Sequence, residues 1–125
     1  MVCVPEVLFW CLLLEDFAHS FGGVCGGEGF YESLKNCESA AALYDEFMAT
    51  PQDKTVPDQW ESQILARILM HHPVIFVSRP EMKEMIEEMK MHYAPTLDEA
   101  VSMAKSWGLE SVTVIPNGVS VVVRE

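Results

Sequence analysis

Residues 50–78 of this chain read TPQDKTVPDQWESQILARILMHHPVIFVS and contain a turn, a helix and an apolar strand in direct succession. Thr55 and Asp58 have the spacing of a capping box, so we expect the Thr55 hydroxyl to accept from a first-turn amide and the helix to open at Asp58. Pro73 disfavours helical geometry at the residue before it, which ends the helix. The run Val74–Val77 is apolar throughout, as in a short strand covered on both faces.

The apolar side chains of this helix recur at intervals of three and four residues, which predicts one buried stripe. Gln59, Gln63 and Arg67 line a polar flank beside it. Trp60 begins this stripe, so the pattern by itself predicts a buried core tryptophan. The stripe consists of Trp60, Ile64, Leu65, Ile68 and Leu69.

Further strands are predicted on both sides of this stretch. Val7–Leu14 is an apolar run that predicts a first strand. Ser111–Ile115 and Val119–Val123 are rich in β-branched residues and predict the last two. Because Asn117-Gly118 between them permits positive φ, we expect a hairpin or a bent strand at the sheet edge.

Other helices carry apolar side chains at helical spacing. They begin near Glu28, Ser39, Pro80 and Thr96. Thr96 and Glu99 form a second capping box, and Gly108 is the expected left-handed helix end. His92–Ala94 is a short strand or a loop. The side chains expected on buried faces are Ala40, Leu43, Phe47, Met82, Met85, Ile86, Met89, Leu97, Ala100, Val101 and Ala104.

Helices that alternate with short, continuous apolar strands predict the fold class. It is α/β: a three-layer sandwich with a short, mainly parallel, Rossmann-like sheet and a C-terminal hairpin or edge strand.

The charge balance excludes some partners. The chain has 19 acidic and 8 basic side chains in 125 residues, a formal net charge of −11. This charge repels nucleic acid and anionic lipid, so neither is expected to bind. Val7–Leu14 is far shorter than the roughly 20 residues that cross a bilayer. Since the first basic side chain is Lys35, a secretory signal would lack its basic start. We expect a single cytoplasmic domain.

No metal site is predicted from cysteine or histidine spacing. The four cysteines, at positions 3, 11, 25 and 37, form no C-x-x-C pair. His71 and His72 are adjacent on the helix, so their side chains point in different directions and do not chelate. We expect them to stabilise the carboxyl end of the helix instead.

Several blocks resemble the carboxy-terminal domain of the nickel-pincer lactate racemase family. That family carries a similar Asp-Gln-Trp helix followed by a short hydrophobic strand. Gly26–Tyr31 resembles the loop that opens its preceding helix, and Val114–Gly118 resembles its closing strand and turn. The resemblance runs from about Gly26 to Val123. It implies that residues 26–125 are a lactate-racemase-like C-terminal domain, preceded by a less similar segment, residues 1–25, that holds a strand and a loop.

The resemblance also implies a function. The chain would be the C-terminal domain, or a fragment, of a 2-hydroxy acid racemase or epimerase. It would close over a nickel-pincer nucleotide bound by a missing N-terminal domain. The catalytic and metal-binding groups would lie in that domain, so the chain alone is expected to bind no cofactor and to be inactive. It exposes the face that meets the missing domain, which makes self-association an expectation.

Trp60 matches the tryptophan that the family places toward its interdomain cleft, with Gln59 and Gln63 as further candidates for contacts to substrate or cofactor. An alternative function is a free-standing acidic α/β binding module that acts with a separate catalytic chain.

Overall fold

The computed structural model describes residues 2–4, 7–11 and 28–114. Five strands form one sheet in the order β4-β3-β2-β1-β5. β2, β3 and β4 are parallel neighbours, whereas β1 is antiparallel to both β2 and β5. All the described strands except β1 therefore run in one direction, so the mainly parallel sheet is confirmed. The strands are β1 (Val2–Val4), β2 (Val7–Cys11), β3 (Val74–Val77), β4 (His92–Ala94) and β5 (Thr113–Val114).

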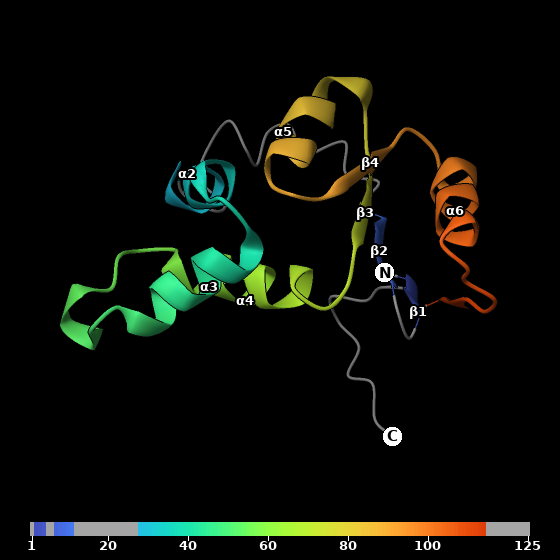
Figure 1. Ribbon diagram of the computed structural model, residues 1–125. Helices are drawn as coiled ribbons and strands as arrows, with labels where there is room; N and C mark the ends of the chain where they lie inside the picture. The colour runs from blue at the N-terminus through green and yellow to red at the C-terminus, as the bar shows by residue number, and fades with distance from the viewer. Residues whose placement is uncertain (1, 5–6, 12–27, 115–125) are drawn as a thin grey trace.

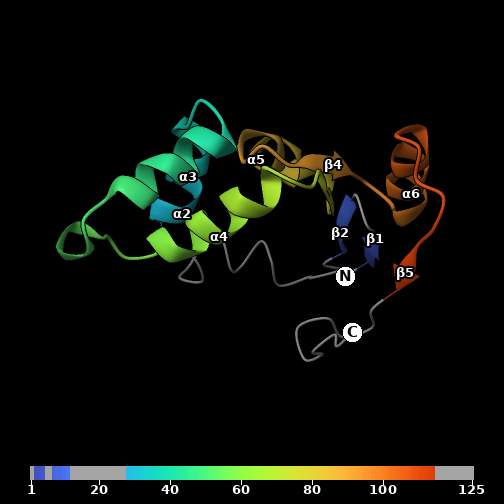
Figure 2. The ribbon, with the colours of Figure 1, turned by 60° about the horizontal axis from the view of Figure 1, so that its bottom comes forward.

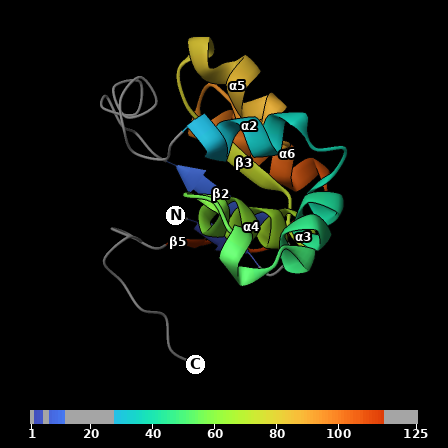
Figure 3. The same ribbon diagram turned by 90° about the vertical axis from the view of Figure 1, so that its left-hand side faces the viewer.

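Helices cover the sheet on both sides. Figure 1 shows the sheet nearly edge-on, with α6 on one side and α2 to α5 on the other. Figure 2 shows α2, α3 and α4 as one cluster away from α6, and Figure 3 looks onto that cluster, with α3 beside α4. The three-layer arrangement is thus confirmed. The helices are α2 (Glu28–Asn36), α3 (Ala40–Ala49), η1 (Gln52–Lys54), α4 (Gln59–Leu69), η2 (Pro80–Met82), α5 (Lys83–Glu88) and α6 (Leu97–Ser106).

β3 lies between β4 and β2 in the sheet, and all four of its residues are buried, as its continuous apolar sequence predicts. Because side chains alternate along a strand, Ile75 and Val77 share one face. They pack there with Ala94, Ala100 and Ala104 of the neighbouring elements. A second core joins the helices and consists of Leu34, Leu43, Ala66 and Met89.

The two predicted capping boxes have different outcomes. At α6 the Thr96 hydroxyl accepts a hydrogen bond from the Glu99 amide at 3.2 Å, as predicted. At α4 the prediction is wrong, because the Thr55 hydroxyl donates to the Gln52 carbonyl at 3.0 Å. Thr55 directly follows the 3-10 helix η1, and the carbonyl of Gln52 in that helix accepts the hydrogen bond from the Thr55 hydroxyl. The helix begins at Gln59, after Asp58 in the left-handed region at φ 66°.

On α6 the prediction of a buried Leu97 is also wrong, since this side chain is 47% exposed. Ala100 and Ala104 lie on the same stripe and are buried. The helix contacts β2, β3 and β4, but its first three residues are all exposed. Gly108 ends the helix at φ 92°, as predicted for a left-handed cap.

The ends of the chain are partly described. The predicted strand at Val7–Leu14 is observed as β2 up to Cys11, and β5 is the predicted edge strand. The predicted turn at Asn117-Gly118 and the strand at Val119–Val123 lie outside the described residues. Among the helices that the structure describes, none is long and apolar enough to cross a bilayer.

Candidate functional site

Helix α4 presents a different face to the core from the one that its apolar periodicity predicts. Its buried residues are Gln59, Ser62 and Ala66. Trp60 is 63% exposed and Ile64 is 47% exposed, so the predicted stripe is wrong at these two positions. Leu65, Ile68 and Leu69, the rest of that stripe, are half-buried.

The reason for this rotation is the contact between α4 and α2. The Ser33 and Ser62 hydroxyls lie 2.8 Å apart, within hydrogen-bond distance, and Ser62 is only 1% exposed. Ala66, one turn further along, packs in the same helical core. Small side chains let two helices approach closely, so α4 buries its small residues and turns its largest aromatic outward.

Several exposed apolar side chains belong to α4 or to segments that hydrogen bonds join to it. Met48 and Val56 are each 60% exposed, and we call these two residues, with Trp60 and Ile64, the Trp60 face. Gln63 connects it to α3, because its Nε2 donates to the Met48 sulfur at 3.1 Å. Exposed apolar groups that cluster in this way mark interaction sites in proteins. The interpretation of Trp60 as a core residue is therefore wrong, and its role in a cleft stays a prediction.

The two predicted glutamines lie differently. Gln63 is half-buried at the rim of the Trp60 face. Gln59 is only 8% exposed, so its predicted place on a polar flank is wrong. Its Oε1 accepts a hydrogen bond from the Val56 amide at 3.4 Å. Gln59 thus contacts its own backbone turn, and of the three candidates Trp60 alone is strongly exposed.

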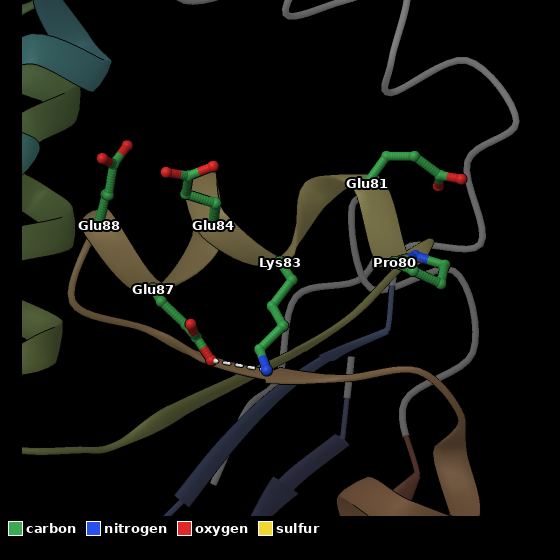
Figure 4. Close-up of a pocket in the computed structure, with 6 residues that line it drawn as sticks. All are labelled: Pro80, Glu81, Lys83, Glu84, Glu87 and Glu88. Carbon is green, nitrogen blue, oxygen red and sulfur yellow. Dashed lines mark ion pairs between the residues drawn. The ribbon is translucent and has the colours of Figure 1, made fainter.

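An open acidic groove lies along η2 and α5 and was not anticipated from sequence. It has a volume of about 660 Å³. Figure 4 shows its side chains, with Lys83 and Glu87 paired at 3.9 Å. No residue of the groove belongs to the Trp60 face, and open carboxylates of this kind are solvated. Its lining residues are Pro80, Glu81, Lys83, Glu84, Glu87 and Glu88.

A polar clamp joins α2 to the end of α5. The Tyr31 hydroxyl donates to Glu88 Oε2, and the Lys35 ammonium lies 3.2 Å from Glu88 Oε1. Lys35 also donates to the Tyr31 hydroxyl at 3.2 Å. The hydrogen bonds from Tyr31 and then Lys35 lower the pKa of the Glu88 carboxyl. The accepting Glu88 raises the pKa of the Tyr31 phenol, since the bond requires the phenol proton.

We expect the Glu88 carboxyl to titrate below 4.5, its ordinary pKa, and to move back toward that value in Tyr31→Phe. A folded-state pKa below the unfolded one stabilises the protein above the unfolded value, and this contribution is lost as pH falls through the folded pKa. Carboxyl-carbon NMR titration of the unsubstituted chain and of Tyr31→Phe measures the two Glu88 midpoints. An unshifted Glu88 midpoint would contradict the clamp.

Comparison with known proteins places this chain in a family. The model of the "Lactate racemase C-terminal domain" family matches residues 16–123. The chain belongs to this family. It is 46% identical over 101 residues to the lactate racemase of Lactiplantibacillus plantarum, and 43% identical over 102 residues to that of Thermoanaerobacterium thermosaccharolyticum. These matches cover 79% and 80% of this chain but 24% of each relative.

A solved structure has the same fold. The lactate racemase apoprotein from Thermoanaerobacterium thermosaccharolyticum superposes with a TM-score of 0.75 at 43% identity, over 80% of this chain and 24% of that one. The chain thus spans about a quarter of the length of the relatives that it matches. The family resemblance carried by the Asp-Gln-Trp helix is confirmed.

The side chains of the described residues do not offer a donor set that fits a metal ion. Within residues 29–114, no three His, Cys, Asp or Glu side chains gather as a metal site requires. His71 and His72 have ring centroids 6.4 Å apart, and His92 packs at 4.8 Å on Trp107. We therefore assign no nickel-binding step to the described residues.

Proposed function

We propose that this chain is the closing domain of a lactate-racemase-type isomerase acting on a small 2-hydroxy acid. Residues 26–125 would form this domain, with the Trp60 face against a cofactor-bearing N-terminal domain. Family membership supports the proposal, and the outward position of the Trp60 indole is the observation that carries it. A buried indole could not reach a partner.

The chemistry supplied by this chain is exclusion of water. In the proposed complex the partner domain would hold the nickel-pincer nucleotide, which would supply hydride-transfer chemistry at the carbon that bears the hydroxyl. The Trp60 ring would cover that centre, and Val56 and Ile64 would extend the apolar cover around it. Removing water strengthens electrostatic interactions inside a site and protects a reactive intermediate from side reactions. Gln63 would offer a carboxamide at the edge of the same cover.

The exposed Trp60 face also fits the alternative function, a free-standing module that acts with a separate catalytic chain. Both functions leave the isolated chain inactive, because the reacting groups lie elsewhere. Both also predict self-association of the isolated chain, since apolar surface without its partner favours contact between copies.

A graft experiment tests the proposal and separates the two functions. Residues 16–123 of this chain would replace the matched segment of the Lactiplantibacillus plantarum lactate racemase. We expect this chimera to interconvert D- and L-lactate and the isolated chain to show no turnover. The control is the relative's remaining segment alone, which should also be inactive.

Mixing the relative's remaining segment with the isolated chain tests the alternative function, the free-standing module. Activity from the mixture at micromolar concentrations would favour the free-standing module. Activity from the chimera alone would favour a domain of one polypeptide. Turnover by the isolated chain would contradict both.

A further inference from the structure

We propose that Gln59 is a positioning residue that fixes the direction of the Trp60 ring. The sequence places Gln59 among the candidates for ligand contact, but the structure turns its side chain away from solvent and onto the turn before α4. Gln59 therefore acts on the Trp60 face through the backbone of the turn and not through contact with a ligand. The functional consequence of this role rests on the proposed function, whereas the positioning itself does not.

Gln59 closes the turn before α4 with two hydrogen bonds to Val56. Its backbone amide donates to the Val56 carbonyl at 3.3 Å, and its side-chain Oε1 accepts from the Val56 amide at 3.4 Å. Both backbone polar groups of Val56 are thus bonded to a single residue. Val56 belongs to the Trp60 face and Gln59 immediately precedes Trp60, so this closure sets the position of two members of that face.

The turn is one that needs support. Asp58 has φ 66°, a left-handed conformation that L-residues adopt at a cost in free energy, and its side chain makes no capping bond to α4. Such conformations persist where surrounding contacts fix them. α2 approaches the turn, since a Cβ on Gly29 would meet the Pro57 carbonyl oxygen at 3.8 Å, an ordinary van der Waals contact. Gln59 adds two hydrogen bonds to the same turn.

Gln59 lies on the buried face of α4. Ser62 lies on the same face, one turn further along, and meets Ser33 of α2. The Gln59 side chain thus lies on the same face of α4 that meets α2 through Ser62. Because Trp60 is the next residue, rotated by about 100° around the helix, its ring must point outward while Gln59 stays inside. Loss of the hydrogen bond from the Val56 amide to the Gln59 side chain leaves the turn with one of its two bonds to Gln59. The contact between Ser62 and Ser33 stays in place.

The test compares Gln59→Met with Gln59→Glu in the full 125-residue chain. Methionine keeps the length of the side chain and removes the acceptor, whereas glutamate keeps an acceptor at a helix start that favours negative charge. In Gln59→Met we expect hydrogen exchange of the Val56 amide to accelerate about fivefold, as for the loss of one ordinary hydrogen bond. We also expect the NMR order parameter of the Trp60 indole N–H to fall below about 0.6. Glutamate should restore both values.

Ser62→Ala is the matched control for a purely structural effect. It removes a buried hydroxyl from the same face and lowers thermal stability, but it should leave the Trp60 order parameter unchanged. If Ser62→Ala loosens Trp60 as much as Gln59→Met does, or if glutamate fails to restore the Val56 amide, the positioning role is overturned.

Turnover of the lactate racemase chimera separates this inference from the proposed function. With both correct, Gln59→Met should lower kcat about tenfold with little change in KM, because a misplaced cover acts on the reacting centre more than on substrate binding. A mobile Trp60 with unchanged turnover would support the positioning role and would contradict the proposed role of Trp60. Unchanged mobility would overturn the inference whatever the kinetics.

Discussion

Trp60→Ala should lower the turnover of the lactate racemase chimera by at least about tenfold, or ~1.4 kcal/mol of transition-state stabilisation. The indole is the largest exposed side chain of the Trp60 face, and its removal would admit water to the proposed centre. The same change should lower the free energy of unfolding by less than about 1 kcal/mol, because the ring is already mostly in solvent. Steady-state kinetics and urea unfolding measure the two quantities.

Trp107→Ala is the matched control for that experiment. Trp107 is 40% exposed and caps the end of α6, on the opposite side of the sheet from α4. We expect this change to leave turnover intact.

A loss of about 3 to 5 kcal/mol in the free energy of unfolding of Trp60→Ala would instead identify a core tryptophan and contradict the observed exposure. Unchanged turnover in Trp60→Ala would rule out the proposed role in the cleft.

Leu34→Ala should be the most destabilising simple truncation in the helical core. Leu34 has no exposed surface and packs with Leu43, Ala66 and Met89, which come from α3, α4 and the end of α5. Removing its side chain leaves a cavity that several elements must close, so we expect a loss of about 2 to 5 kcal/mol in the free energy of unfolding. Urea unfolding followed by far-UV circular dichroism measures it.

Leu97→Ala provides the same chemical change on the surface. Leu97 is 47% exposed in the first turn of α6, so we expect its truncation to cost less than about 0.5 kcal/mol. The helical pattern of the sequence predicts the opposite, a buried Leu97. Equal losses for Leu34→Ala and Leu97→Ala would favour the sequence pattern over the structure at this helix.

Much of the candidate site was visible in the sequence, but its geometry was not. The Asp-Gln-Trp helix drew attention to Trp60, and the structure places this ring in solvent. The helical pattern placed Gln59 on a polar flank, whereas its side chain is buried and accepts a hydrogen bond from the Val56 amide. The α2–α5 clamp of Tyr31 and Glu88 could not be predicted from sequence, because it joins residues 57 positions apart. No local spacing could reveal it.

Local physics alone determined the features that depend on a few neighbouring residues. The continuous apolar run Val74–Val77 specified a strand buried on both faces, and Thr96 and Gly108 specified the two ends of a helix. Tertiary structure decided which side of α4 is buried. The periodicity of large apolar side chains favoured Trp60 and Ile64, but close packing against α2 requires small side chains at the contact. Ser62 and Ala66 meet that requirement, so α4 buries them and leaves the tryptophan exposed.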